Sequence, residues 1–148
     1  MGKFLVYLAL GLMAAAAGMA FAAEVEKPAS CEQCGMDRTA FAQSRMLVVY
    51  ADGTIAGTCS IHCAVLEMKA HKGKKVEALK VADYGTKTLI DAAKAVWVIG
   101  GSKNGVMTAL AKWAFADRAE AEKFVRESGG RVTTFEEALE LAERETSM

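Results

Sequence analysis

The sequence predicts an α+β fold in which antiparallel hairpins each pack on a helix. Three observations support this prediction. The spacing of apolar residues changes between alternating and helical along the chain, tight-turn residues separate the alternating segments, and capping motifs precede the helical ones. Strand, hairpin and helix occur twice in this order. We therefore expect a small two-lobed fold, with lobes at about residues 31–94 and 95–148.

The first 22 residues have the pattern of a secretory signal peptide. Lys3 provides a basic start, residues 4–20 are almost wholly apolar, and Ala20-Phe21-Ala22 matches a small-residue cleavage site. An uncleaved membrane anchor is the alternative, since about 20 apolar residues can span a bilayer. We expect cleavage after Ala22, which leaves residues 23–148 as a periplasmic domain without a stable membrane anchor.

The composition argues against two classes of function. Lys plus Arg and Asp plus Glu each total 18, so the chain has no net formal charge. Proteins that bind nucleic acid normally carry a basic excess, and this class is therefore not expected. With two histidines and no serine elbow, the chain offers no evident catalytic triad, and we do not expect an enzyme.

The first predicted lobe contains a hairpin, a helix and a further strand. Residues 45–50 and 54–58 have strand patterns on either side of the turn residues Asp52-Gly53. A helix follows and runs to about Ala70, and residues 75–84 form the next strand. The apolar stripe of the helix has i, i+3, i+4, i+7 spacing and contains Ile61, Ala64, Val65 and Met68.

The second predicted lobe contains short strands and two capped helices. The strands are expected at residues 95–99, 113–115 and 131–133. Asp117-x-x-Glu120 and Thr134-x-x-Glu137 have the form of capping boxes, so a helix should follow each of them. The first helix should stop at Gly129-Gly130 and the second near Arg144.

The cysteines form two groups whose spacing indicates a metal site. Cys31-x-x-Cys34 alone is shared by zinc ribbons, redox proteins and disulfide knots, but here it is combined with Cys59-x-x-His62-Cys63. If the helix begins at Cys59, these three side chains share one face, which residues 31–36 could cover. The helix N-terminus should also lower the pKa of Cys63 and favour the thiolate that binds metal.

Soft sulfur ligands indicate which ion would bind. Thiolate and thioether select Cu(I), whereas mixed cysteine and histidine sets also suit Zn(II). Met36 places a thioether beside the first cysteine pair, which favours Cu(I) and leaves Zn(II) as the alternative.

Two other functions use the same cysteines. In an exported protein Cys31 and Cys34 could form a local disulfide. The first alternative is therefore a binding module in which the cysteines only stabilise the fold, through disulfides or a bound zinc ion. A periplasmic thiol-disulfide oxidoreductase is the second alternative. Its motif normally follows a strand and opens a helix, whereas this pair follows a polar leader, residues 24–30, that we expect to be flexible.

Several segments of the chain resemble one protein family. These segments are Cys31-x-x-Cys34-Gly35-Met36, Trp97-Val98-Ile99-Gly100 with Gly105-Val106-Met107, and Phe115-Ala116-Asp117 with Ala121, Phe124, Gly129-Gly130 and Phe135-Glu136-Glu137. Together they resemble the nitrous-oxide reductase accessory protein family, NosL. The resemblance implies a periplasmic Cu(I) chaperone for nitrous-oxide reductase, with a fold similar to that of organomercurial lyase.

The resemblance also implies ligands. By motif match Cys34, Met36 and Met107 become copper ligands, and the last of these would not be singled out by composition. The chain lacks the lipidated cysteine of many family members and adds the second cysteine group, so the client could be nitrous-oxide reductase or another cuproenzyme. The complete predicted ligand set, sufficient for one or two ions, is Cys31, Cys34, Met36, Cys59, His62, Cys63 and Met107.

Overall fold

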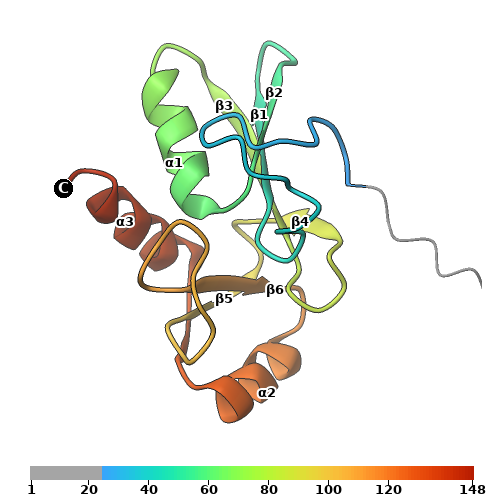
Figure 1. The fold of residues 1–148 in the computed structure, drawn as a ribbon, viewed down its shortest axis with the longest axis vertical. Helices are drawn as coiled ribbons and strands as arrows, with labels where there is room; N and C mark the ends of the chain where they lie inside the picture. Colours follow the sequence, from blue (N-terminus) through green and yellow to red (C-terminus); the bar gives the residue numbers. More distant parts are fainter. Residues whose placement is uncertain (1–24) are drawn as a thin grey trace, which may run out of the picture.

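The structure, a computed structural model, describes residues 25–148. Two small antiparallel sheets lie one above the other, with helices beside and below them (Figure 1). This arrangement confirms the predicted α+β fold class. The predicted signal peptide, residues 1–22, lies outside the described residues. Within the described part, no helix is both long enough and apolar enough to cross a membrane.

The first sheet has the strand order β2-β1-β3-β4, with all neighbours antiparallel. Its strands are β1 (Met46–Tyr50), β2 (Ile55–Thr58), β3 (Val76–Ala82) and β4 (Leu89–Asp91). The predicted hairpin is confirmed: β1 pairs with β2 around a turn in which Gly53 has a φ of +84°, a conformation that glycine adopts without strain. β4, a strand of three residues, is not predicted from the sequence.

The second sheet has the strand order β6-β5-β7, again antiparallel. Its strands are β5 (Val96–Ile99), β6 (Lys112–Phe115) and β7 (Arg131–Thr133). All three strands are predicted from the sequence. The central strand, β5, is the most apolar of the three. It is buried on both faces, since Trp97 lies in one buried cluster and Val98 in another.

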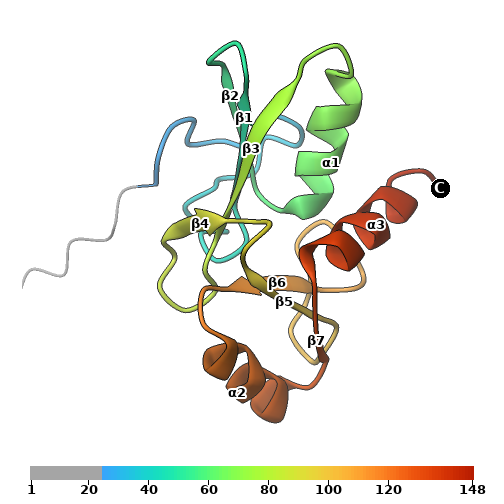
Figure 2. The same ribbon diagram turned by 180° about the vertical axis from the view of Figure 1, so that it is seen from behind.

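In residues 25–148, three helices cover the sheets (Figure 2). They are α1 (Ile61–Ala70), α2 (Arg118–Ser128) and α3 (Phe135–Glu145). The first packs on β1 and β2, the second on the β6-β5-β7 sheet, and α3 contacts both α1 and β5. The two predicted N-caps are confirmed, since the side chains of Asp117 and Thr134 accept hydrogen bonds from backbone N–H groups in the first turns of α2 and α3.

The beginning of α1 differs from the prediction. Ser60 is the N-cap residue, with an extended backbone, so the helix begins at Ile61 and not at Cys59. Cys59 therefore lies in the turn that joins β2 to α1. The predicted single helical face for Cys59, His62 and Cys63 is wrong, although the predicted apolar stripe of α1 does face the core.

The buried residues form two clusters: the main core draws on both sheets, whereas the strand residues of the second cluster all come from the β6-β5-β7 sheet. The main core joins the β2-β1-β3-β4 sheet and α1 to Trp97, Ala114 and α3. The second cluster, which we call the thiol-side core, contains Cys31, Cys59, Cys63, Val98, Val106, Ala111, Trp113, Phe115, Ala121 and Phe124. Three of the four cysteines are thus part of a packed interior.

Candidate metal site

Four thiols meet where the loop of residues 31–36, the turn before α1 and the first turn of α1 come together. The sulfur atoms of Cys31, Cys34, Cys59 and Cys63 all lie within 4.8 Å of one another, and none is in a disulfide. The Sγ atom of Cys59 lies 3.6 Å from that of Cys34 and 3.7 Å from that of Cys63. Cys59 is therefore the central member of the group.

The four thiols differ sharply in exposure. Cys59 and Cys63 are fully buried at 0 %, and Cys31 is 3 % exposed. Cys34 is only partly buried. Of the four sulfur atoms, that of Cys34 is the one that a molecule from solvent can approach.

The contacts among the thiols determine which of them ionises first. Hydrogen bonding with Cys63 lowers the pKa of Cys59 to about 6, although burial acts in the opposite direction. The same hydrogen bond, together with burial, raises the pKa of Cys63, and burial raises the pKa of Cys34 to about 11. The predicted thiolate at Cys63 is therefore wrong. Cys59 is the first thiol to become a thiolate, because its neighbours stabilise its negative charge.

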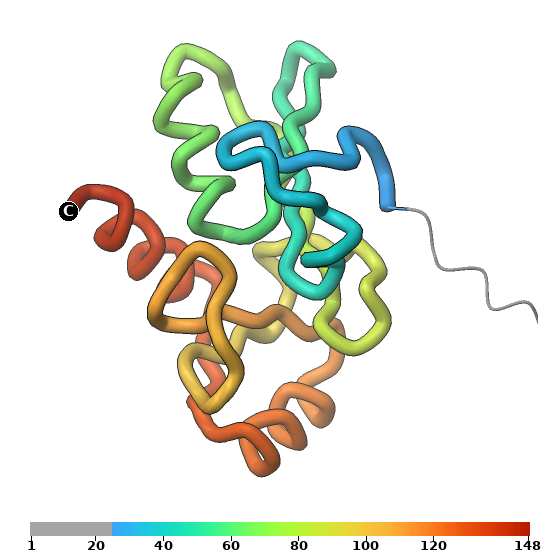
Figure 3. The backbone as a smooth tube through the Cα atoms, in the orientation of Figure 1, coloured from blue at the N-terminus to red at the C-terminus, as the bar shows by residue number. Residues whose placement is uncertain are grey.

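The loop that carries Cys31 and Cys34 is held by its own backbone and by the first lobe. Within the loop, Cys31 N–H donates to the carbonyl of Met36, and Gly35 N–H donates to the carbonyl of Cys31, both at 2.8 Å. The amide of Gln33 donates to the buried carboxylate of Glu67 on α1 at 2.6 Å. The loop therefore rests against α1, as the tube in Figure 3 shows.

A buried arginine anchors this loop to the sheet. The guanidinium of Arg38, 0 % exposed, donates to the carbonyls of Glu26 and Pro28 in the leader and to those of Met46 and Thr58 in the sheet. It also pairs with the Glu26 carboxylate at 2.5 Å. The prediction of a flexible leader is wrong for residues 25–30, because this arginine holds them against the body. An arginine within a polar stretch gives no sequence signal of such a role.

The other predicted ligands lie apart from the four thiols or at their edge. Met36 is partly buried and packs against the thiol-side core. Met107, in the loop between β5 and β6, is 43 % exposed with a φ of +58°, and the preceding Val106 belongs to the thiol-side core. His62 is not among the residues whose ligand atoms gather at the site. Burial lowers its pKa, and its Nδ1 atom is buried without a hydrogen-bond partner among the described residues.

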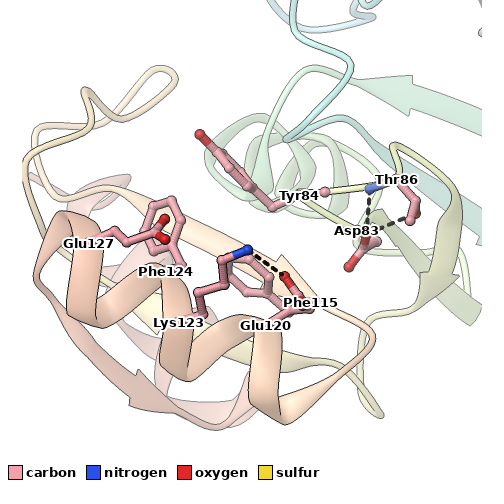
Figure 4. A pocket seen from close by; sticks show the side chains of 9 residues that line it. Asp83, Tyr84, Thr86, Phe115, Glu120, Lys123, Phe124 and Glu127 are labelled. Carbon is pink, nitrogen blue, oxygen red and sulfur yellow. Dashed lines mark hydrogen bonds and ion pairs between the residues drawn. The ribbon is translucent and has the colours of Figure 1, made fainter.

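A separate pocket lies between α2 and the loop that follows β3 (Figure 4). Its volume is about 290 Å³, and the rings of Tyr84, Phe115 and Phe124 line it. These rings pack on one another with centroids 4.9 to 5.6 Å apart. No cysteine lines this pocket, so it is distinct from the thiol site.

Comparisons with known proteins agree with this architecture. Residues 22–141 match the family model NosL. The crystal structure of the copper chaperone NosL from Shewanella denitrificans is 20 % identical in sequence, with a TM-score of 0.60, over 77 % of this chain and 92 % of that chain. No curated protein gives a significant match. The solved structure shows a shared fold, and the family match covers most of the sequence. The chain therefore belongs to the NosL family.

Proposed function

We propose that the protein is a periplasmic copper chaperone, which binds Cu(I) through Cys31, Cys34, Cys59 and Cys63 and passes it to a cuproenzyme. The observation that carries this proposal is the gathering of four sulfur atoms within 4.8 Å of one another. Membership of the NosL family supports it, since a solved relative with the same fold is described as a copper chaperone. Nitrous-oxide reductase is the client that the family resemblance implies.

The spacing of the sulfur atoms fits a metal ion at their centre. A tetrahedral centre with metal–sulfur bonds of about 2.3 Å places its sulfur ligands about 3.8 Å apart. The Cys34–Cys59 and Cys59–Cys63 distances, 3.6 and 3.7 Å, are close to this value. These two distances already suit a bound ion, and thiolates are the ligands that Cu(I) prefers.

The unequal exposure of the thiols suits transfer of the ion. Cu(I) is exchanged by replacing one ligand at a time, and an incoming ligand must first reach the ion. Cys34 is the partly exposed thiol, whereas the other three form the buried floor of the site. Cys34 is therefore the ligand that a partner's thiolate or thioether replaces first. Met36, two residues further along the same loop, is the thioether best placed to assist.

The same arrangement of four thiols also fits one alternative function, a structural zinc site. Four cysteines in tetrahedral arrangement are common in proteins that use Zn(II) for stability. The two functions differ in the preferred ion and in whether the ion leaves. A structural site holds Zn(II) permanently, whereas a chaperone site binds Cu(I) more tightly and yields it to a competing ligand.

Competition titrations on residues 23–148 distinguish these functions. The reduced protein should bind Cu(I) far more tightly than Zn(II) in the presence of chelators of known affinity. The double variant Cys31→Ser/Cys34→Ser should lose most of the Cu(I) affinity. Met68→Leu, which alters a methionine packed on the main core, is the matched control and should bind normally. Preference for Zn(II), or full Cu(I) affinity in the double variant, contradicts the proposal.

A further inference from the structure

Cys34 and Cys59 approach each other from two separate parts of the chain. Their sulfur atoms are 3.6 Å apart, and the residues lie 25 positions apart in the sequence. A disulfide bond brings two sulfur atoms to about 2.05 Å, so these two need to move together by about 1.5 Å. Gly35 follows Cys34 in the loop, and a Cβ atom added there would meet nothing within 4 Å, so the loop has open space on this side.

The exposure of the two thiols defines an order of reaction. Thiol–disulfide exchange begins when a thiolate attacks an accessible disulfide. Only Cys34 among the four thiols is accessible to an external disulfide, because the other three are 0 to 3 % exposed. Cys59 lies directly behind Cys34 and is positioned to attack it in turn.

We infer that Cys34 and Cys59 form a reversible disulfide that closes the thiol site. In the first step the Cys34 thiol gives up its proton to solvent, its sulfur bonds to one sulfur of an external disulfide, and the other sulfur leaves as a thiolate. In the second step the Cys59 thiolate bonds to the Cys34 sulfur, and the first external sulfur leaves. Two cysteine thiols lose two electrons and two protons, and the two sulfur atoms of the external disulfide become thiols.

This bond would control metal uptake at the site. It removes two of the four thiolates and leaves Cys31 and Cys63 buried behind it. In a compartment where disulfides persist, the protein would therefore need a dithiol reductant before it could take up Cu(I). This consequence rests on the proposed function, whereas the bond itself does not.

Two other pairings are less favourable. Cys59 and Cys63 are 3.7 Å apart, but both are fully buried, so neither can begin the exchange with an external disulfide. Cys31 and Cys34 are close in sequence, and Cys34 could start the reaction. However, the Sγ atom of Cys59 already lies 3.6 Å from that of Cys34, and we infer from this contact that Cys59 is the preferred second partner.

Peptide mapping tests the assignment. The reduced, metal-free protein is treated with excess oxidised glutathione, its remaining thiols are alkylated after unfolding, and the digest is analysed by mass spectrometry. We expect a peptide pair joined through Cys34 and Cys59, with alkyl groups on Cys31 and Cys63. Dithiothreitol should reverse the bond. The oxidised protein should take up at least about tenfold less Cu(I), and reduction should restore the uptake.

Single serine variants separate the possible outcomes. Cys31→Ser should still form the bond, whereas Cys34→Ser should remain reduced under the same conditions. A dominant Cys31–Cys34 peptide, or four free thiols in the wild-type protein, overturns the inference. Cu(I) titration of the fully reduced protein tests the proposed function separately. If the Cys34–Cys59 bond forms but the reduced protein binds no Cu(I), the bond is supported and the copper function is not.

Discussion

The central position of Cys59 has a consequence for the pH at which the site is ready to bind metal. Its pKa of about 6 lies below the ordinary thiol value of about 8.5. Since the pKa is lowered in the folded state, this group stabilises the fold above its ordinary value, and the contribution is lost as the pH falls through about 6. We therefore expect one thiolate at the site near neutral pH.

The first prediction is that one thiol of the reduced, metal-free protein ionises near pH 6. Ultraviolet thiolate absorbance measured against pH should show this step, because hydrogen bonding with Cys63 favours the Cys59 thiolate. Cys59→Ser should abolish the step. Cys31→Ser leaves the Cys59–Cys63 contact in place and should retain the step, shifted to a higher pH because Cys31 also hydrogen bonds to Cys59. If every thiol ionises only in the ordinary range, the assignment of the thiolate is wrong.

The second prediction concerns which cysteine an alkylating reagent modifies first: the most accessible thiol or the most readily ionised one. The thiolate is the reactive form, which would favour Cys59, but an alkylating reagent cannot reach a fully buried sulfur. Access should decide the outcome, so iodoacetamide should modify Cys34 first in the native, reduced protein. Peptide mapping after a short reaction measures the order. Cys34→Ser should then slow the overall loss of thiols, and modification of Cys59 before Cys34 would contradict this prediction.

At the scale of elements, a few buried polar contacts fix the two cysteine pairs of the site relative to each other. The loop of residues 31–36 brings one cysteine pair, and the junction of β2 and α1 brings the other. Arg38 connects them, because it binds the leader carbonyls before the loop and the carbonyl of Thr58 at the end of β2. Its position determines where the first pair lies relative to the second.

The third prediction follows from this connection. Arg38→Met leaves several carbonyls without their donor and removes one of the two arginines that pair with the Glu26 carboxylate, so the free energy of unfolding should fall by about 3 kcal/mol. Urea denaturation measures the change. Cu(I) affinity should also fall, because the two cysteine pairs are no longer held together. Arg118→Met, on the exposed surface of α2, is the control and should change neither quantity.

A variant at Gly57 tests the same contact from the other side. A Cβ atom added there would lie 2.6 Å from Nη1 of Arg38 and 2.8 Å from Cδ of Pro28. Gly57→Ala should therefore displace the leader and weaken Cu(I) binding even though the arginine remains. Gly73→Ala, where the added atom has nothing within 4 Å, is the matched control. Normal Cu(I) affinity in Gly57→Ala would show that the anchor does not position the thiols.

These elements also show what the sequence could and could not predict. The hairpin and the caps of α2 and α3 depend on local chemistry, at Asp52-Gly53, Asp117 and Thr134, and are therefore visible in the sequence. The beginning of α1 is less visible, because Ser60 caps the helix without a side-chain hydrogen bond. The convergence of the cysteines is predicted in outline. The thiolate and the role of Arg38 arise from tertiary contacts, which no local pattern contains.

At the scale of the whole molecule, the two sheets are tied together at the end of β3. Asp83 forms a parallel bridge with Ala114 of β6. Its carboxylate accepts hydrogen bonds from the N–H groups of Ala116, beyond β6, and Thr86, both within 2.8 Å. Burial would raise the pKa of Asp83, but these hydrogen bonds outweigh it and the pKa is lowered. The stability that this carboxylate provides is present above its ordinary pKa and is lost as the pH falls through the lowered value.

The fourth prediction is that both sheets unfold as one unit and that Cu(I) stabilises the whole unit. Trp97 lies in the main core, which contains residues of both sheets, and Trp113 lies in the thiol-side core, whose strand residues come from the β6-β5-β7 sheet. The single-tryptophan variants Trp97→Phe and Trp113→Phe therefore report the two cores separately by fluorescence in urea. Within each variant, fluorescence should change at the same urea concentration as circular dichroism, which follows the whole fold.

Cu(I) should raise the unfolding midpoint in both variants, because in this scheme it binds only the folded state. At a free Cu(I) concentration 100 times the Kd, the stabilisation is about 2.7 kcal/mol. If Cu(I) moved only the Trp113 signal, the thiol-side core would unfold independently, and the contacts through Asp83 and α3 would not couple the sheets.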